Sequence, residues 1–202
     1  MPECSIGLVP DVGGSFLLAK LPGNIGTFLG TTGKRMNASD AIYCGFADYF
    51  VPEKKWEDLK EKLVATGNVD WIKKFQKSTQ TSEIEKSFSQ ISEAMVDISS
   101  KNIELRLKHP FFEKDLSALR FNSPISVAYT IMMLKMEKVR NNISDALDAE
   151  YGFTARSQEF GDFQEGIRAV VIDKDRNPSW KHKSLTEVSE EDLQPFFQTI
   201  HR

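Results

Sequence analysis

The sequence predicts a mainly helical chain, and three observations support that fold class. Apolar residues recur at spacings of three and four over long stretches, as they do along one face of a helix. Glycine, which weakens helices, is absent between Gly67 and Gly152. Only the start of the chain and residues 48–51 have the composition of short strands.

Composition and charge limit the class of protein. The 202 residues are 40% hydrophobic and 27% charged, with a net charge of −3, which predicts a soluble globular protein of one domain or one and a half. Without a basic stripe, we expect no nucleic-acid partner. No apolar run approaches the roughly 20 residues of a membrane span, so we expect no membrane insertion. Cys4 and Cys44 form no CxxC pair, which favours a reducing compartment.

The elements follow in order from turn and helix signals. Eight of the 12 glycines fall in the first 45 residues, which predicts short elements joined by tight turns. Residues 53–64 and 71–75 have helical patterns. Ser82 begins a capping box, and helical spacing of apolar residues continues over residues 83–107.

The remaining elements are three predicted helices and an extended segment. Ser123 and Pro124 start an amphipathic helix, whose apolar positions are Ile125, Ala128, Met132, Met136 and Val139. After a break at residues 141–142, a second apolar face consists of Ile143, Leu147, Tyr151 and Ala155. Residues 172–189 are predicted to be extended, before a short last helix that Ser189 caps.

Two carboxylates in the opening segment, MPECSIGLVPDVGG, are the candidate site. Glu3 ends a strand-like stretch, and Asp11 lies in a turn that opens a helix. Their apolar neighbours would desolvate a carboxylate and raise its pKa, which suits a general acid or base near neutral pH. The same pattern also fits purely structural roles, with Asp11 as a helix N-cap and Glu3 as a frayed terminal residue.

Other catalytic motifs are missing from the sequence. It contains no GxSxG, GxxxxGK[ST], GxGxxG or HExxH pattern. His109, His182 and His201 are scattered, so we expect surface histidines and no catalytic metal. These observations argue against serine hydrolases, nucleotide hydrolases, dehydrogenases and zinc enzymes.

Residues 1–23 and 28–52, the latter reading FLGTTGKRMNASDAIYCGFADYFVP, resemble the second half of the crotonase (enoyl-CoA hydratase/isomerase) superfamily. Within it, the chain is most similar to the 3-hydroxyisobutyryl-CoA hydrolase group. Two features carry that closer resemblance: Asp11 in the PDVGG turn, and residues 163–175, FQEGIRAVVIDKD, followed by Pro178 and Trp180.

The resemblance implies a fold and an activity. Residues 1–52 would end the core of a crotonase-like α/β (ββα superhelix) fold, and residues 53–202 would form a helical C-terminal region. The implied activity is hydrolysis of a branched hydroxyacyl-CoA thioester in valine breakdown. Glu3 would attack the thioester or activate water, and Asp11 would assist proton transfer and contact the substrate hydroxyl, so both would be catalytic and substrate-binding.

The resemblance also implies that part of the machinery lies elsewhere. Both oxyanion-hole N–H groups of the superfamily precede the segment that matches Met1, so we expect a C-terminal half that is inactive alone. An enoyl-CoA hydratase or isomerase, and a non-catalytic structural or binding subunit, are the alternatives. We expect an acyl-CoA substrate, no separate cofactor, a possible homo-oligomer, and a location in the bacterial cytoplasm or the mitochondrial matrix. Glu165, Asp173 and Asp175 are predicted to be solvated or ion-paired.

Overall fold

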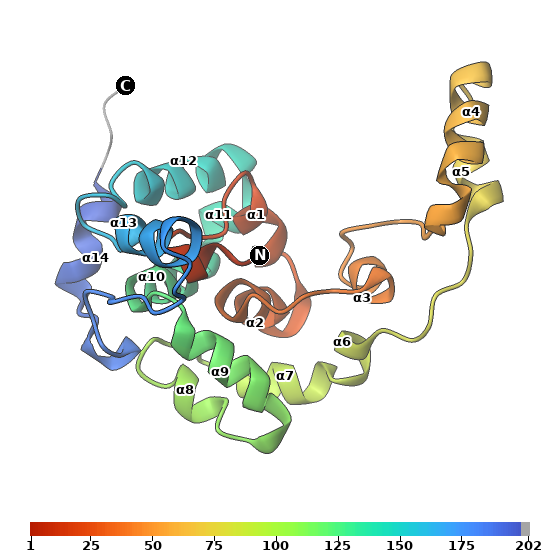
Figure 1. Ribbon diagram of the computed structural model, residues 1–202. Helices are drawn as coiled ribbons and strands as arrows, with labels where there is room; N and C mark the ends of the chain where they lie inside the picture. Colours follow the sequence, from red (N-terminus) through yellow and green to blue (C-terminus); the bar gives the residue numbers. More distant parts are fainter. Residues whose placement is uncertain (199–202) are drawn as a thin grey trace. The chain divides into compact units, whose positions relative to one another are not determined.

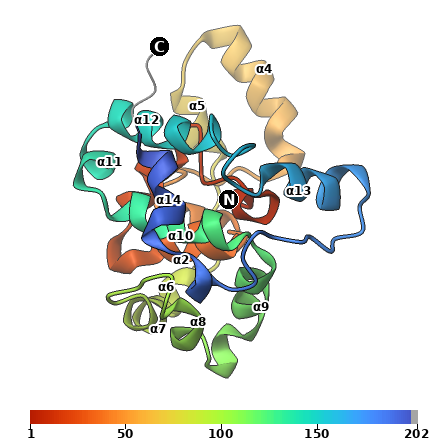
Figure 2. The ribbon, with the colours of Figure 1, turned by 90° about the vertical axis from the view of Figure 1, so that its left-hand side faces the viewer.

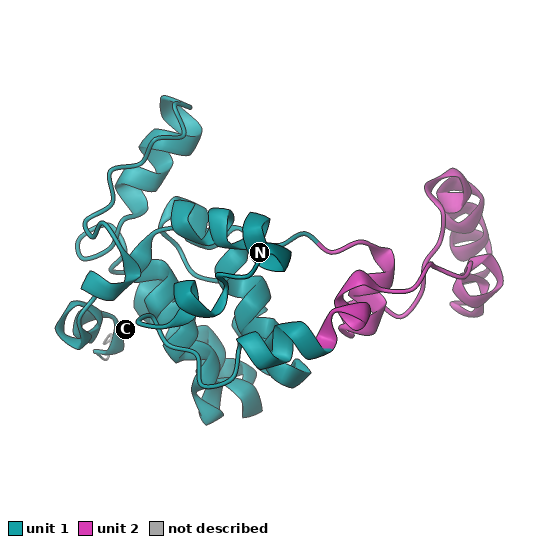
Figure 3. Ribbon diagram, turned by 90° about the horizontal axis from the view of Figure 1, so that it is seen from below, with its two compact units in different colours: residues 1–35, 89–202 teal, residues 36–88 magenta. Residues whose placement is uncertain are grey.

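A computed structural model describes residues 1–198, and all regular elements within them are helical (Figure 1). The chain divides into two compact units, residues 1–35 with 89–202 and residues 36–88 (Figure 3). None of the described helices combines the length and apolar composition of a membrane span. The predicted boundary at residue 52 stays a prediction.

Both predicted strands are wrong. The start of the chain instead forms a 3-10 turn, η1 (Glu3–Ile6), in which Ser5 N donates to Pro2 O at 2.9 Å. Residues 48–51 have no ladder of hydrogen bonds; Phe50 O accepts a single bond from Lys77 N at 2.9 Å. A strand needs a partner along its length, and none lies beside these segments among residues 1–198.

The glycine-rich opening forms short helices, as predicted. These are α1 (Gly14–Ala19), η2 (Pro22–Asn24) and α2 (Ile25–Thr32). Gly33, with φ 65°, is the left-handed C-cap that ends α2. At Gly26 a Cβ would lie 1.9 Å from Leu18 O, so only glycine allows α1 and α2 to approach so closely.

The second unit contains α3 (Ala38–Tyr43), η3 (Glu53–Lys55), α4 (Trp56–Thr66), α5 (Asp70–Phe75) and α6 (Glu83–Lys86). Asp40 joins the two ends of this unit, since its Oδ1 accepts from Ser82 Oγ at 2.6 Å and Ile84 N at 3.0 Å. The helices predicted at residues 53–64 and 71–75 are confirmed.

The helical spacing over residues 83–107 corresponds to three short helices rather than to one continuous helix. α6 is followed by α7 (Phe88–Ala94) and α8 (Ile103–Arg106). Asp97 adopts a left-handed conformation with φ 50°, and Asn102 closes the loop by donating to Asp97 O at 3.1 Å. The apolar spacing is real, but a polar loop interrupts it.

The core of the first unit is α10 (Pro124–Lys135), which η4 (Pro110–Phe112) and α9 (Glu113–Phe121) precede. Ser123 Oγ caps it by accepting from Ser126 N at 3.2 Å, so the predicted start is confirmed. The predicted amphipathic character is wrong, because ten of its residues are buried and α1, α2 and α14 all contact it. Figure 2 shows α2 and α14 beside α10. It ends at Lys135, and α11 (Glu137–Asn141) is separate.

The face predicted for the next helix is inverted. In α12 (Ile143–Thr154), Ile143 and Leu147 are each 44% exposed, whereas Ala146, Glu150 and Phe153 point into the protein. Phe153 stacks on Phe196 with ring centroids 4.4 Å apart. The burial of this face places a carboxylate, Glu150, inside the unit.

The C-terminal part begins with α13 (Phe163–Ile167) and a π-helical turn, η5 (Arg168–Ile172). It continues through η6 (Leu185–Glu187) to α14 (Glu190–Phe197). Ser189 and Asp192 form a capping box at the start of α14, which confirms the predicted N-terminus of the last helix.

Candidate active site

Glu3 lies half-buried in η1, and its Oε2 is buried without a hydrogen-bond partner in the described chain. Burial raises the pKa of Glu3, and the negative charges of Asp11 and Glu150 raise it further, against its own backbone N–H and the Met1 ammonium. A carboxylate in this state can accept or release a proton closer to neutral pH than an exposed one.

The reading of Glu3 as a frayed terminal residue is wrong. The next residue, Cys4, is fully buried, and its carbonyl accepts from Ser123 N at 2.9 Å, immediately before α10. Desolvation raises the pKa of the Cys4 thiol to about 12. The backbone that carries Glu3 is therefore held against the core of the first unit.

Asp11 lies half-buried in the turn before α1, close enough to Glu3 for the two charges to interact. Its carbonyl accepts from Gly14 N at 2.7 Å. The N-cap of α1 is Gly13, with φ 83° and no capping side chain of its own. The reading of Asp11 as the helix N-cap is therefore wrong, and the described hydrogen bonds leave its carboxylate available for other contacts.

The capping function falls instead to Glu150, which the sequence patterns did not identify. Its Oε2 accepts from Gly13 N at 2.9 Å, and its Oε1 accepts from Ser15 N at 3.0 Å and from Ser15 Oγ. Glu150 is 3% exposed. The one signal in the sequence was an acid in register with Ala146 and Phe153, at helical spacing between two residues that are buried.

The backbone is strained at Val12, between Asp11 and the Gly13 N–H that binds Glu150. Val12 has φ 49°, a left-handed conformation that is a genuine outlier for a β-branched residue. Its side chain is 89% exposed. Strained residues of this kind persist where the surroundings fix the backbone, and they cluster at functional sites.

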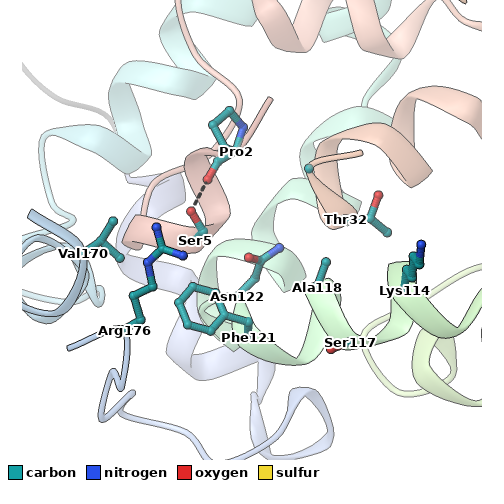
Figure 4. Close-up of a pocket in the computed structure, with 11 residues that line it drawn as sticks. Pro2, Ser5, Thr32, Lys114, Ser117, Ala118, Phe121, Asn122, Val170 and Arg176 are labelled. Carbon is teal, nitrogen blue, oxygen red and sulfur yellow. Dashed lines mark hydrogen bonds between the residues drawn. The ribbon is translucent and has the colours of Figure 1, made fainter. Parts of the chain in front are cut away.

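A cavity of about 590 Å³ lies on another side of η1 (Figure 4). Lys114 and Arg176 supply cationic groups at different parts of its wall, and Ser5, whose hydroxyl donates to Pro2 O at 2.7 Å, lies near the arginine. Among the described residues that line it, none is acidic. The cavity can therefore accept an anionic group.

The acids of the C-terminal segment are ion-paired, as predicted. The Arg168 guanidinium contacts Glu165 at 2.8 Å, Asp173 at 2.6 Å and Asp175 at 2.7 Å. The Arg168 hydrogen bonds, with one from Ser179 N, lower the pKa of Glu165 to about 2. These carboxylates hold the segment that presents Arg176.

The described histidines have structural contacts. His109 Nδ1 accepts from Phe111 N at 3.2 Å, and His182 lies 3.2 Å from Asp192. His201 lies outside the described residues.

The half-buried Glu3 in η1, the PDVGG turn and the helices that follow occur in the same order as the sequence segments on which the crotonase resemblance rests. The chain belongs to the enoyl-CoA hydratase/isomerase family, whose model matches residues 1–197. The 3-hydroxyisobutyryl-CoA hydrolases of mitochondria from Mus musculus and Homo sapiens are 34% and 35% identical to it, over 99% of this chain and 55% of theirs. The chain thus spans about half the length of the curated relatives it matches.

Two solved structures share its fold. An enoyl-CoA hydratase from Rhodobacter sphaeroides is 42% identical, with a TM-score of 0.89 over 97% of this chain and 58% of that one. A carnitinyl-CoA dehydratase from Mycobacterium thermoresistibile is 29% identical, with a TM-score of 0.90 over 99% and 58%. The crotonase fold is therefore confirmed for the part that the chain covers.

Proposed function

We propose that the chain carries the acid–base residues of an acyl-CoA thioester hydrolase that acts on 3-hydroxyisobutyryl-CoA. The observation that carries this proposal is the half-buried Glu3, with one unpartnered oxygen and a raised pKa, next to Asp11. The names of the curated relatives support the substrate. An aspartate in the PDVGG turn supports the hydrolase rather than the hydratase.

In this proposal the two carboxylates divide the work. In one route Glu3 takes a proton from a water that attacks the thioester carbonyl, so that a C–O bond forms and the C–S bond breaks. In the other route the Glu3 carboxylate attacks and displaces the thiolate, and water then hydrolyses the resulting anhydride, which releases the acid and regenerates Glu3. Asp11 contacts the substrate hydroxyl and assists transfer of the proton to the departing thiolate. The products are a free carboxylic acid and CoA, with water as the only co-reactant.

The anionic part of CoA is proposed to lie in the cavity lined by Lys114 and Arg176, since cationic side chains with apolar neighbours suit a phosphorylated ligand. CoA is part of the substrate, and we propose no further cofactor. The names of the eukaryotic relatives support a mitochondrial location in a eukaryote, and within the mitochondrion we propose the matrix; in a bacterium we propose the cytoplasm.

The test is turnover of 3-hydroxyisobutyryl-CoA and of crotonyl-CoA by a longer natural chain that contains these residues, since the 202-residue chain alone is expected to be inactive. We expect hydrolysis of the first substrate to be faster. Glu3→Gln and Asp11→Asn should each lower kcat by about 10²–10⁴-fold, while Glu159→Gln, at an exposed position, serves as the matched control. Faster turnover of crotonyl-CoA would contradict the hydrolase.

An enoyl-CoA hydratase is the second candidate, favoured by the 42% identity to the enoyl-CoA hydratase from Rhodobacter sphaeroides. In that case Glu3 would handle water or the α-proton of the enoyl substrate. A non-catalytic binding role predicts that Glu3→Ala and Asp11→Ala leave function intact. The same pair of substrates and the same variants therefore separate all three possibilities.

A further inference from the structure

We infer that Glu150 is a positioning residue of the candidate active site: by binding the backbone on the far side of Val12, it fixes the turn that presents Asp11. The effect on catalysis rests on the proposed function, whereas the effect on the turn does not. Glu150 lies 137 residues from Gly13 in sequence, on α12, so it connects two distant segments of the first unit at the carboxylate site.

The chemistry of the contact requires a carboxylate. Three donors, Gly13 N, Ser15 N and Ser15 Oγ, converge on the two oxygens of one buried side chain. A glutamine at this position offers one accepting oxygen, and its amide nitrogen would face an N–H group. A buried charge carries a desolvation cost, which these charge-assisted hydrogen bonds offset.

The contact lies where the backbone is most strained. Val12 and Gly13 both have positive φ, 49° and 83°. A valine in that conformation is destabilising and is retained only if its surroundings fix it. The hydrogen bonds from Gly13 and Ser15 to Glu150 begin one residue after Val12, so their loss lets the turn relax and moves Asp11, which precedes it.

Glu150 also acts on Glu3 through its charge. The pKa of Glu3 is therefore a readout that would not change if Glu150 only held the turn in place. The charged groups that interact with Glu3 are the Met1 ammonium, Asp11 and Glu150, and the two carboxylates raise the pKa of Glu3. Removal of the Glu150 charge therefore lowers the pKa of Glu3, even where the fold is intact.

The experiment compares Glu150→Gln with Glu159→Gln, which removes the same charge from an exposed position. NMR would follow the Gly13 and Ser15 amides and the titration of the Glu3 carboxyl. We expect amide exchange about tenfold faster at both residues, as for loss of a charge-assisted hydrogen bond, and a lower titration midpoint for Glu3. The control should show neither. Unchanged amides and an unchanged midpoint in folded Glu150→Gln would overturn the inference.

Ser15→Ala keeps the Glu150 charge and removes only the hydroxyl donor, so it remains informative if Glu150→Gln does not fold. We expect faster exchange at Ser15 with the Glu3 midpoint preserved; unchanged exchange at Ser15 in this variant would contradict the proposed contact. If hydrolysis is observed, Glu150→Gln should lower kcat by about 10²-fold, as for a misplaced catalytic group, with little change in KM. Because the NMR measurements need no turnover, failure of the proposed function and failure of this inference give different results.

Discussion

Glu3 has the properties of a residue retained at the expense of stability. The side chain is half-buried, and its Oε2 has no hydrogen-bond partner in the described chain. The charged carboxylate therefore loses solvation by water, and no hydrogen bond to that oxygen replaces it. Functional sites often contain such local costs, because a group that must meet a substrate cannot be satisfied by the protein beforehand. The stability cost of the Glu3 charge can be measured without any knowledge of the substrate.

We predict that Glu3→Gln stabilises the chain at pH 7 by about 1 kcal/mol, or roughly 2–4 °C in Tm. The pKa of Glu3 is raised in the folded state, so folding takes up a proton. The cost of the charge is therefore present above the folded pKa and vanishes below the ordinary value of 4.5. Thermal melts of both proteins from pH 4 to pH 8 test this. A stability difference that does not narrow toward low pH would contradict the prediction.

Val12 offers a second test at the residue scale. Val12→Gly relieves a left-handed valine, and after the entropic cost of glycine the net gain should be about 1 kcal/mol. Val64→Gly is the control, because that side chain is equally exposed, at 89%, but lies within the helix α4. We expect the first variant to melt higher than the parent and the second to melt lower. Equal destabilisation would mean that the Val12 turn stores no strain.

Sequence reasoning identified two of the three carboxylates of the candidate site. Glu3 and Asp11 are close in sequence and lie among apolar residues and glycines, so their setting is visible locally. Glu150 is identified only by contacts with Gly13 and Ser15, about 135 residues away. No local sequence pattern indicates a hydrogen-bond partner so far away, and an acidic residue in a helix is normally predicted to face solvent.

At the scale of elements, α12 shows how a helical period can fit two faces. Ile143, Leu147 and Tyr151 follow one another at intervals of four, which predicts a buried stripe, yet each is more than 40% exposed. The buried stripe runs through Ala146 and Phe153, where an aromatic cluster with Tyr129 and Phe196 decides the orientation. Local starts were more predictable, as Ser123 and Ser189 show, because capping depends only on neighbouring residues.

We predict that Phe153→Ala lowers the free energy of unfolding by about 3–5 kcal/mol, because it empties a fully buried site. Leu147→Ala, on the exposed side of the same helix, should change it by less than about 1 kcal/mol. Urea unfolding of the two variants gives both values. Similar losses of stability in the two variants would contradict the assignment of Phe153 to the buried face and Leu147 to the exposed face.

At the scale of the whole molecule, the unit of residues 36–88 depends on one buried carboxylate. Burial alone would raise the pKa of Asp40, but hydrogen bonds from Ser82, Ile84 N and Asn37 N outweigh it and hold the pKa below its usual value. Its stabilising contribution is therefore present above pH 3.8, the unfolded value, and is lost as the pH falls through the folded pKa.

We predict that Asp40→Asn weakens this unit by about 2 kcal/mol, the scale of hydrogen bonds to a charged group. Asp48→Asn, exposed in the same unit, is the control. Hydrogen exchange should accelerate in α3 and α6 and remain unchanged in α10 of the other unit. Acceleration of equal size in α10 would show that the two units unfold together.

The bond between Gly13 and Glu150 also determines when the site can form during synthesis. The two residues are 137 positions apart, and ribosomes add about 5–20 residues per second. For roughly 7–27 s, the nascent turn that bears Asp11 has left the peptidyl-transferase centre while its anchoring carboxylate has yet to be translated. The turn that bears Asp11 is therefore translated well before the carboxylate that anchors it, so a chain arrested before Glu150 carries both Glu3 and Asp11 without the anchor of that turn.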